Sequence, residues 1–175
     1  MKIIAFAASS SKQSINKKLA TYAASLLEGH EIEILDLNDY EMPIFSSDKE
    51  EALGQPEQAK AFYKKIGEAD ALIISFAEHN ASYTAAYKNL YDWTSRIDMK
   101  VYQNKPAVLL ATSPGPGGAK NVLETAKQSA PYFGLDVKAD LSIGKFFDVF
   151  DLENQTIKDQ SIQQDLATAV SKLSI

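Results

Sequence analysis

Residues 2–27 read KIIAFAASSSKQSINKKLATYAASLL, and the rest of the chain repeats the alternation of strand and helix that this segment begins. After Lys2 the first residues are all apolar, which is typical of a buried strand. A serine-rich turn follows, and apolar residues then recur at helical spacing from Ile15 to Leu27. This order places free backbone N–H groups and the positive end of a helix dipole at the turn. We therefore expect the turn to hold a phosphate; the alternative is an ordinary serine or asparagine helix cap.

The composition is that of a globular protein, which we expect to form a single domain over residues 1–175. We find no apolar run approaching the roughly 20 residues of a membrane span and no leader pattern. The absence of cysteine excludes disulfides and thiolate metal sites and fits a cytoplasmic location. The formal net charge of −5 argues against a nucleic-acid partner. Local donors must therefore hold any anionic ligand.

Strand and helix patterns alternate along the rest of the chain. Further strands are expected at residues 31–37, 71–76, 106–112 and 136–143. Helices are expected with Pro56 at the first helical position, from about Thr84, from about Ala119, and from Ser161, where a capping-box pattern begins. Residues 39–50 read as a long loop, either functional or a plain surface excursion, and residues 144–150 as irregular chain. Five strands and five helices predict a doubly wound α/β sandwich with a parallel sheet in the order 2-1-3-4-5.

Three unusual loops follow the first, third and fourth strands, at residues 9–16, 77–83 and 113–118. These strands are neighbours in the predicted order, and ligands bind at the carboxyl ends of such strands. The third loop has three glycines, which allow backbone to approach a flat ligand closely. A phosphate at one end and backbone edges at the other suit a mononucleotide with a large heteroaromatic ring. Taken alone, the third loop could equally be a glycine turn before a helix.

Motifs of several other nucleotide-binding and hydrolytic classes are missing. The chain has no G-x-x-x-x-G-K-[S/T] P-loop and no G-x-G-x-x-G after the first strand. It also lacks a G-x-S-x-G nucleophile elbow. His30 and His79 are the two histidines, and their separation gives no metal-ligand spacing.

Three motifs match one family. Residues 8–19 read ASSSKQSINKKL against the family pattern G-S-x-R-x-x-S-x-N-x-x-L. Residues 77–93 read AEHNASYTAAYKNLYDW against P-E-Y-N-G-S-x-P-G-x-L-K-N-x-x-D-W, and residues 113–118 read SPGPGG, a serine- and glycine-rich loop. With these motifs the chain resembles the NADPH-dependent FMN reductases, a flavodoxin-like family that includes quinone, chromate and azo-dye reductases.

The resemblance implies a flavodoxin-like three-layer sandwich that binds FMN and takes hydride from NADPH or NADH. It implies a small-molecule electron acceptor such as a quinone, a free flavin or an azo compound, and assembly as a homodimer or homotetramer. The redox chemistry belongs to the cofactor, so no side chain is assigned as catalytic. The implied cofactor-binding residues are Ser9, Ser11, Lys12, Ser14, Ile15 and Asn16 at the phosphate, and Ala77, Glu78, His79, Asn80, Ser113, Gly115, Pro116, Gly117 and Gly118 around the isoalloxazine ring.

The chain departs from the family pattern at several positions. Ser11 replaces an arginine, with Lys12 next to it, and Ala8 replaces a glycine. Two alternatives therefore stay open: an FMN electron carrier without NAD(P)H oxidation, and a binding module without flavin. Carriers of this fold usually have T-x-T-G-x-T in the first loop, which is absent here. Lys88 and Asp92 at helical spacing, with Trp93, are interpreted as a structural ion pair and a packed aromatic.

Overall fold

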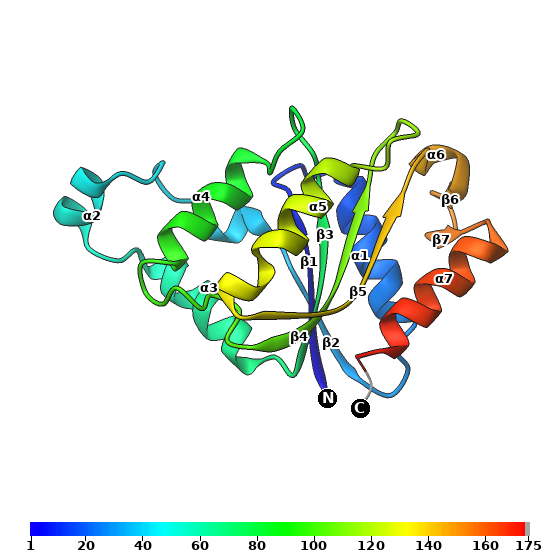
Figure 1. The fold of residues 1–175 in the computed structure, drawn as a ribbon, viewed down its shortest axis with the longest axis horizontal. Coiled ribbons are helices and arrows are strands. Elements are labelled where there is room, and N and C mark those ends of the chain that lie inside the picture. Colours follow the sequence, from blue (N-terminus) through cyan, green and yellow to red (C-terminus); the bar gives the residue numbers. More distant parts are fainter. Residues whose placement is uncertain (174–175) are drawn as a thin grey trace.

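Five parallel strands form one sheet in the order β2-β1-β3-β4-β5 (Figure 1). The computed structural model describes residues 1–173. The strands are β1 (Lys2–Ala8), β2 (Glu31–Leu35), β3 (Ala71–Phe76), β4 (Lys105–Thr112) and β5 (Leu135–Ile143). The observed order confirms the prediction and places the switch point between β1 and β3.

Helices cover both faces of the sheet. One face carries α1 (Ile15–Ser25) and α7 (Gln160–Ser171); the other carries α3 (Glu57–Glu68), α4 (Ala85–Thr94) and α5 (Lys120–Ser129) (Figure 1). Alternate residues of β1 enter different cores: Ile3 packs on the α1 side, and Ile4 packs with α3 and α4. This double coverage explains why the central strands are mostly apolar. Within residues 1–173, none of the helices has the length and apolarity to cross a bilayer.

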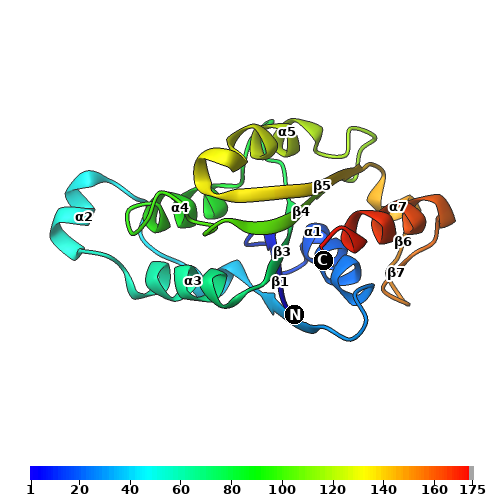
Figure 2. The ribbon, with the colours of Figure 1, turned by 60° about the horizontal axis from the view of Figure 1, so that its bottom comes forward.

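Short elements form in two segments that we expected to be irregular. Residues 39–50 contain the end of a 3₁₀ turn, η1 (Leu37–Tyr40), and most of α2 (Ser47–Leu53). The hydroxyl of Ser46 caps α2 by accepting the Lys49 N–H at 3.2 Å, and this local cap explains the helix. Helix α2 buries none of its residues and stands away from the sheet (Figure 2).

The second such segment follows β5. It contains α6 (Phe146–Val149), after which β6 (Phe150–Asp151) pairs antiparallel with β7 (Thr156–Ile157). The rings of Phe146 and Phe150 stack at a centroid distance of 4.7 Å and are fully buried. Phe146 and Phe150, which we read as irregular chain, therefore belong to the core under α1 and α7, whereas Phe147 is exposed.

Two predicted helix starts are wrong, one by lying too early and one by lying too late in the chain. Pro56 is the N-cap of α3, with extended backbone, and the helix begins one residue later. The carboxylate of Asp159 caps α7 by accepting the N–H groups of Ser161 and Ile162 at 2.9 and 3.1 Å, so no capping box starts at Ser161. The expected end of α5 is confirmed, since the 3₁₀ turn η2 (Ala130–Phe133), with Pro131 in it, follows directly.

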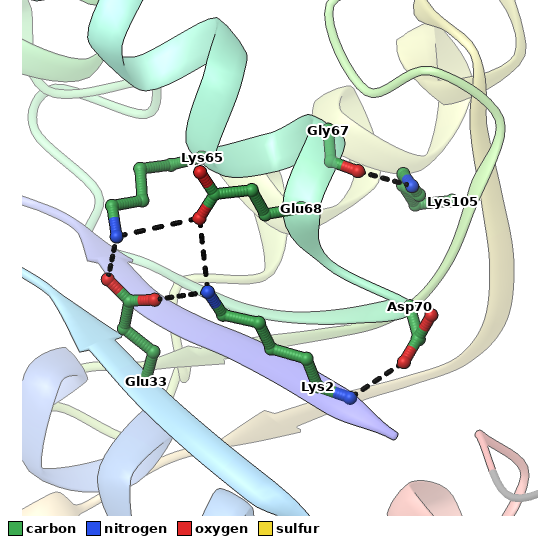
Figure 3. A network of polar contacts seen from close by, with 7 residues as sticks. All are labelled: Lys2, Glu33, Lys65, Gly67, Glu68, Asp70 and Lys105. Carbon is green, nitrogen blue, oxygen red and sulfur yellow. Dashed lines mark hydrogen bonds and ion pairs between the residues drawn. The ribbon is translucent and has the colours of Figure 1, made fainter.

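An ion network closes the edge of the sheet at the amino ends of the strands (Figure 3). The Lys2 ammonium lies 3.0 Å from Glu33 and 3.1 Å from Glu68, and Lys65 lies 2.6 Å from Glu33. The hydrogen bonds to Glu33 and Glu68 raise the pKa of Lys2 to about 12. The backbone N–H of Lys2 also donates to the Asp70 carboxylate at 2.7 Å. The network joins β1, β2 and the end of α3 opposite the three unusual loops.

Candidate functional site

The loops after β1, β3 and β4 line one hollow of about 270 Å³. Its position follows from the strand order, because the carboxyl ends of these neighbouring strands lie at one edge of the sheet. The first loop contributes six lining residues, and the other two contribute three each. The lining residues are Ser9, Ser11, Gln13, Ser14, Ile15, Asn16, Ala77, Glu78, His79, Thr112, Ser113 and Pro114.

Serine hydroxyls fix the shape of the first loop. The Oγ of Ser9 accepts the Ser11 N–H at 3.2 Å, and the Oγ of Ser11 accepts the Gln13 N–H at 3.3 Å. The Oγ of Ser14 accepts the Lys17 N–H at 3.1 Å and so caps α1. Each oxygen acts here as an acceptor, which leaves each hydroxyl hydrogen available to a ligand. The loop is therefore both a helix cap and a set of donors.

The amino end of α1 adds backbone donors to this set. Ile15 and Asn16 are the first two helical residues, and the N–H groups at such positions have no acceptor within the helix. The helix dipole places partial positive charge at the same point. Hydroxyl hydrogens, backbone N–H groups and a dipole together suit an anion, although no lysine or arginine lines this hollow.

The side chain of Asn16 joins the start of α1 to the ends of β3 and β4. It is almost fully buried. Its Oδ1 accepts the Ser75 hydroxyl at 2.7 Å and the Thr112 N–H at 3.1 Å, and its Nδ2 donates to the Thr112 carbonyl at 3.1 Å. Both acceptor positions are thus used within the fold. Any phosphate contact of Asn16 has to come from its backbone N–H or from the one remaining amide hydrogen.

Glu78 couples the second loop to the third. Its carboxylate accepts the Val122 N–H at 2.9 Å. Val122 is the third residue of α5, whose N-cap residue, Ala119, has a left-handed φ of 57° and no side-chain cap. The charge of Glu78 at this helix amino end is favourable. Glu78, which we predicted beside a flavin ring, lines the hollow, and its carboxylate also caps α5.

The tip of the second loop is a tight turn between His79 and Ser82. The His79 N–H donates to the Ser82 carbonyl at 3.0 Å, and the Ser82 N–H donates back at 3.1 Å. Between them Asn80 and Ala81 have φ values of 52° and 61°. A turn with two left-handed positions is most often occupied by Asn-Gly, whereas this chain has Asn-Ala there. Both residues are exposed, and neither lines the hollow.

The third loop packs tightly onto the end of β5. Gly118 has a φ of 62°, and a Cβ on it would lie 2.4 Å from the Ser142 hydroxyl. A Cβ on Gly144 would lie 2.5 Å from the Pro116 carbonyl oxygen. The Ser142 hydroxyl donates to the Gly118 carbonyl at 2.7 Å. We expected the glycines to let the backbone approach a ligand closely. At Gly118 the backbone instead approaches the end of β5.

Lys88, Asp92 and Trp93 of α4 have the structural roles that we interpreted from the sequence. Lys88 and Asp92 form an ion pair at 2.6 Å on the surface of α4. Trp93 is fully buried, and its indole N–H donates to the Pro43 carbonyl at 2.8 Å. The Asn89 amide donates to the same carbonyl at 3.1 Å. These contacts anchor the segment before α2 on α4.

The sequence of this chain also matches a known protein family. The sequence model described as NADPH-dependent FMN reductase matches residues 1–162. The chain belongs to this family. An NAD(P)H-dependent FMN reductase from Pseudomonas aeruginosa is 29% identical over 174 residues, which cover 95% of this chain and 91% of the relative. A 2-hydroxy-1,4-benzoquinone reductase from a Burkholderia species is 34% identical over 117 residues, which cover 66% of this chain and 62% of the relative.

Solved structures of flavoenzymes have the same fold as this FMN reductase family member. The NAD(P)H:(acceptor) oxidoreductase FerB from Paracoccus denitrificans superposes with a TM-score of 0.79 at 24% identity, covering 98% of this chain and 94% of the other. An FMN-dependent NADH-azoreductase from Bacillus anthracis, solved in complex with FMN, gives a TM-score of 0.66 at 14% identity over the full length of both chains. These likenesses confirm the flavodoxin-like architecture.

Residues of the hollow in this FMN reductase family member fit the cofactor. The hydroxyls and free N–H groups of the first loop suit a phosphate dianion, and backbone of the other two loops lies beside it. Of the predicted binding residues, nine line the hollow, and the others do not: Lys12, Asn80, Gly115, Pro116, Gly117 and Gly118. Three lining residues were missed, Gln13, Thr112 and Pro114. Each is next to a predicted residue in the sequence. A prediction that included every residue of each loop and the last residue of each strand would have contained all three.

Proposed function

We propose that this FMN reductase family member transfers hydride from NADPH or NADH to bound FMN and passes the electrons to a small acceptor such as a quinone, a free flavin or an azo compound. The observation that carries the proposal is the single hollow at the switch point, with the donors of the serine loop and α1 at one side. Family membership and the activities named for the relatives support it.

In this proposal FMN supplies the redox chemistry, accepting hydride and releasing electrons to the acceptor. The chain binds and orients it. The hydroxyls of Ser9, Ser11 and Ser14 and the first N–H groups of α1 hold the phosphate. The side chain of Asn16 holds the ends of β3 and β4, and that of Glu78 holds the start of α5, so both fix the positions of the loops. Among residues 1–173 no cluster of carboxylate or histidine side chains that could hold a metal ion is present.

The proposal is tested by measuring both flavin binding and reduction. Purified protein is loaded with FMN, desalted, and mixed anaerobically with NADPH or NADH while the visible spectrum is recorded. Retained flavin bands that bleach are expected, and the two rates give the coenzyme preference. Retained bands that do not bleach favour the electron-carrier alternative, and a colourless protein favours the module without flavin.

The phosphate assignment has its own test. The apo-protein should bind FMN at least tenfold more tightly than riboflavin, which differs by the missing phosphate. Ser11→Ala should weaken FMN and leave riboflavin unchanged, since hydrogen bonds to charged groups contribute on the order of 1.5–3 kcal/mol. Equal binding of FMN and riboflavin would contradict the assignment.

We also propose that the chain assembles as a homodimer or homotetramer, with α2 and the segment before it at the interface. The Ile44 side chain is 75% exposed and that of Leu53 is 59% exposed. The backbone around Ile44 is nevertheless fixed on α4, because the Asn89 amide donates to the Met42 and Pro43 carbonyls and accepts the Phe45 N–H. Apolar side chains presented by a fixed backbone are typical of an interface. The single domain over residues 1–175 and the cytoplasmic location stay part of this proposal.

The assembly is tested by light scattering during size-exclusion chromatography. The wild-type protein should run at a multiple of the 19.2 kDa chain mass. An Ile44→Asp/Leu53→Asp variant should shift toward the monomer without loss of helical content. A monomeric wild-type protein at micromolar concentration would contradict the proposal.

A further inference from the structure

A second hollow, of about 470 Å³, follows the surface of α1 and adjoins the proposed phosphate site. Gln13 and Ser14 line both hollows, so the two are continuous around the serine loop. We call this second hollow the α1 groove. It is lined mainly by residues of α1 and of the preceding loop, and Gln155 of the turn between β6 and β7 contributes from the side. The groove therefore begins where a flavin phosphate would lie.

The α1 groove concentrates positive charge on a chain whose net charge is −5. Lys12, Lys17 and Lys18 all line it. Lys17 is paired with Asp36 at 2.5 Å, so its charge is largely compensated. Lys18 contacts the neutral amide oxygen of Gln155 at 3.4 Å, and in the part of the chain that the structure describes neither Lys18 nor Lys12 is in an ion pair. Two ammonium groups are thus available to an anion next to the serine loop.

An aromatic ring lies farther along the same groove. Tyr22 lines it and is half-buried. Its ring meets Phe150 edge-on at a centroid distance of 6.4 Å and an interplanar angle of 87°, which fixes its orientation. Tyr22 lies eight residues beyond Ser14 on α1, or about 12 Å at 1.5 Å per residue. That separation suits a phosphate and a ribose placed between the serine loop and a stacked base.

We propose that the α1 groove binds the adenylate half of FAD, so that the chain accepts FAD as well as FMN. The second phosphate lies against Lys12 and Lys18, and the adenine stacks on Tyr22. The inference rests on the proposed function, since it begins from a flavin phosphate at the serine loop. Gln13 and Ser14 line both hollows, which favours FAD over a separately bound NADPH or NADH. A ligand that extends from the first phosphate would pass directly from one hollow into the other.

The experiment compares FMN, FAD and riboflavin binding to the apo-protein by flavin fluorescence and calorimetry. FAD should bind at least as tightly as FMN. A Lys12→Gln/Lys18→Gln variant should weaken FAD at least tenfold and change FMN less than threefold. Tyr22→Leu should weaken FAD alone, and Tyr22→Phe, which keeps the ring, should retain it. A Lys64→Gln/Lys100→Gln variant removes the same charge from exposed positions off the groove and serves as the matched control.

Several results would overturn the inference. FAD binding a hundredfold weaker than FMN would mean that the groove excludes the adenylate. Equal weakening of FMN and FAD in the Lys12/Lys18 variant would mean that the lysines act on the first phosphate. Unchanged FAD binding with a raised KM for NADPH in the FMN-loaded variant would assign the groove to the coenzyme. If neither FMN nor FAD binds, the proposed function fails as well, and riboflavin that still binds in that case would show that the site holds a flavin ring without the predicted phosphate contacts.

Discussion

Asn16 and Thr112, 96 positions apart in the chain, exchange two hydrogen bonds of 3.1 Å each. The Asn16 amide pairs with the Thr112 backbone as a neighbouring strand would, at the point where β4 ends. The Ser75 hydroxyl completes the arrangement from β3. The loops that line the hollow are therefore held by one buried side chain, and the shape of the hollow depends on it.

Replacing Asn16 by alanine should strongly destabilise the fold. The change leaves the Thr112 N–H, the Thr112 carbonyl and the Ser75 hydroxyl buried without partners, at a cost of about 2–4 kcal/mol. Urea unfolding followed by circular dichroism measures this. Gln13→Ala, at an exposed position of the same loop, is the control and should change stability by less than ~0.5 kcal/mol. Equal midpoints for the two variants would show that the Asn16 bonds contribute nothing.

Glu78 should matter as a hydrogen-bond acceptor more than as a charge. Glu78→Ala removes the cap of α5 and should cost about 1–2 kcal/mol, whereas Glu78→Gln keeps an acceptor for the Val122 N–H and should cost less than ~1 kcal/mol. Chemical denaturation of the two variants distinguishes these. If glutamine costs as much as alanine, charge rather than capping holds the two loops together.

The turn after β3 stores strain that a single substitution can release. Ala81 has a φ of 61°, which costs an L-residue roughly 1–2 kcal/mol, and glycine adopts it freely. Ala81→Gly should therefore stabilise the protein by about 0.5–1 kcal/mol after the added entropy of the unfolded chain. Ala61→Gly, on the exposed face of α3, should destabilise by about 1 kcal/mol. Thermal unfolding that moves both variants in the same direction would rule out strain at Ala81.

Acid should weaken the ion network at the amino edge of the sheet. Hydrogen bonds from Lys65 and Lys2 lower the pKa of Glu33, and a bond from Lys2 lowers the pKa of Glu68, both from 4.5. The unfolded chain then binds more protons than the folded one in acid, so this stabilisation is complete above about pH 4.5 and is lost as pH falls through the lower folded values. Because the carboxylates are partly exposed, solvent screens the network and the loss should be small.

Urea unfolding between pH 3 and pH 7 tests this dependence. Glu33→Gln removes the central carboxylate and should flatten the decline in the free energy of unfolding with acid. Glu51→Gln, on exposed α2, removes a glutamate outside the network and should leave the decline as in the wild-type protein. A wild-type slope retained in Glu33→Gln would place the acid-sensitive groups elsewhere.

Apolar patterning was sufficient to predict the strands, and the strand order followed from the order that is common among five-stranded doubly wound folds. Near-continuous apolar runs such as residues 71–76 suit strands that are buried on both faces, as β3 is, and several of them alternating with helix patterns indicate a parallel sheet. The same patterning says little about helix ends. Helix α3 begins one residue after Pro56, and Asp159 rather than Ser161 caps α7, because the exact end of a helix depends on the local backbone path.

The positions of the three loops at one edge of the sheet also followed from the sequence, since strand order alone brings their ends together. What the polar side chains do there could not be predicted. Asn16 and Glu78 have the residue types of ligand-binding groups, yet their partners are the Thr112 backbone and the Val122 N–H, which lie far along the chain. A hydrogen-bonding group binds whichever acceptor or donor the folded chain brings within about 3 Å, and only the tertiary structure brings those partners together.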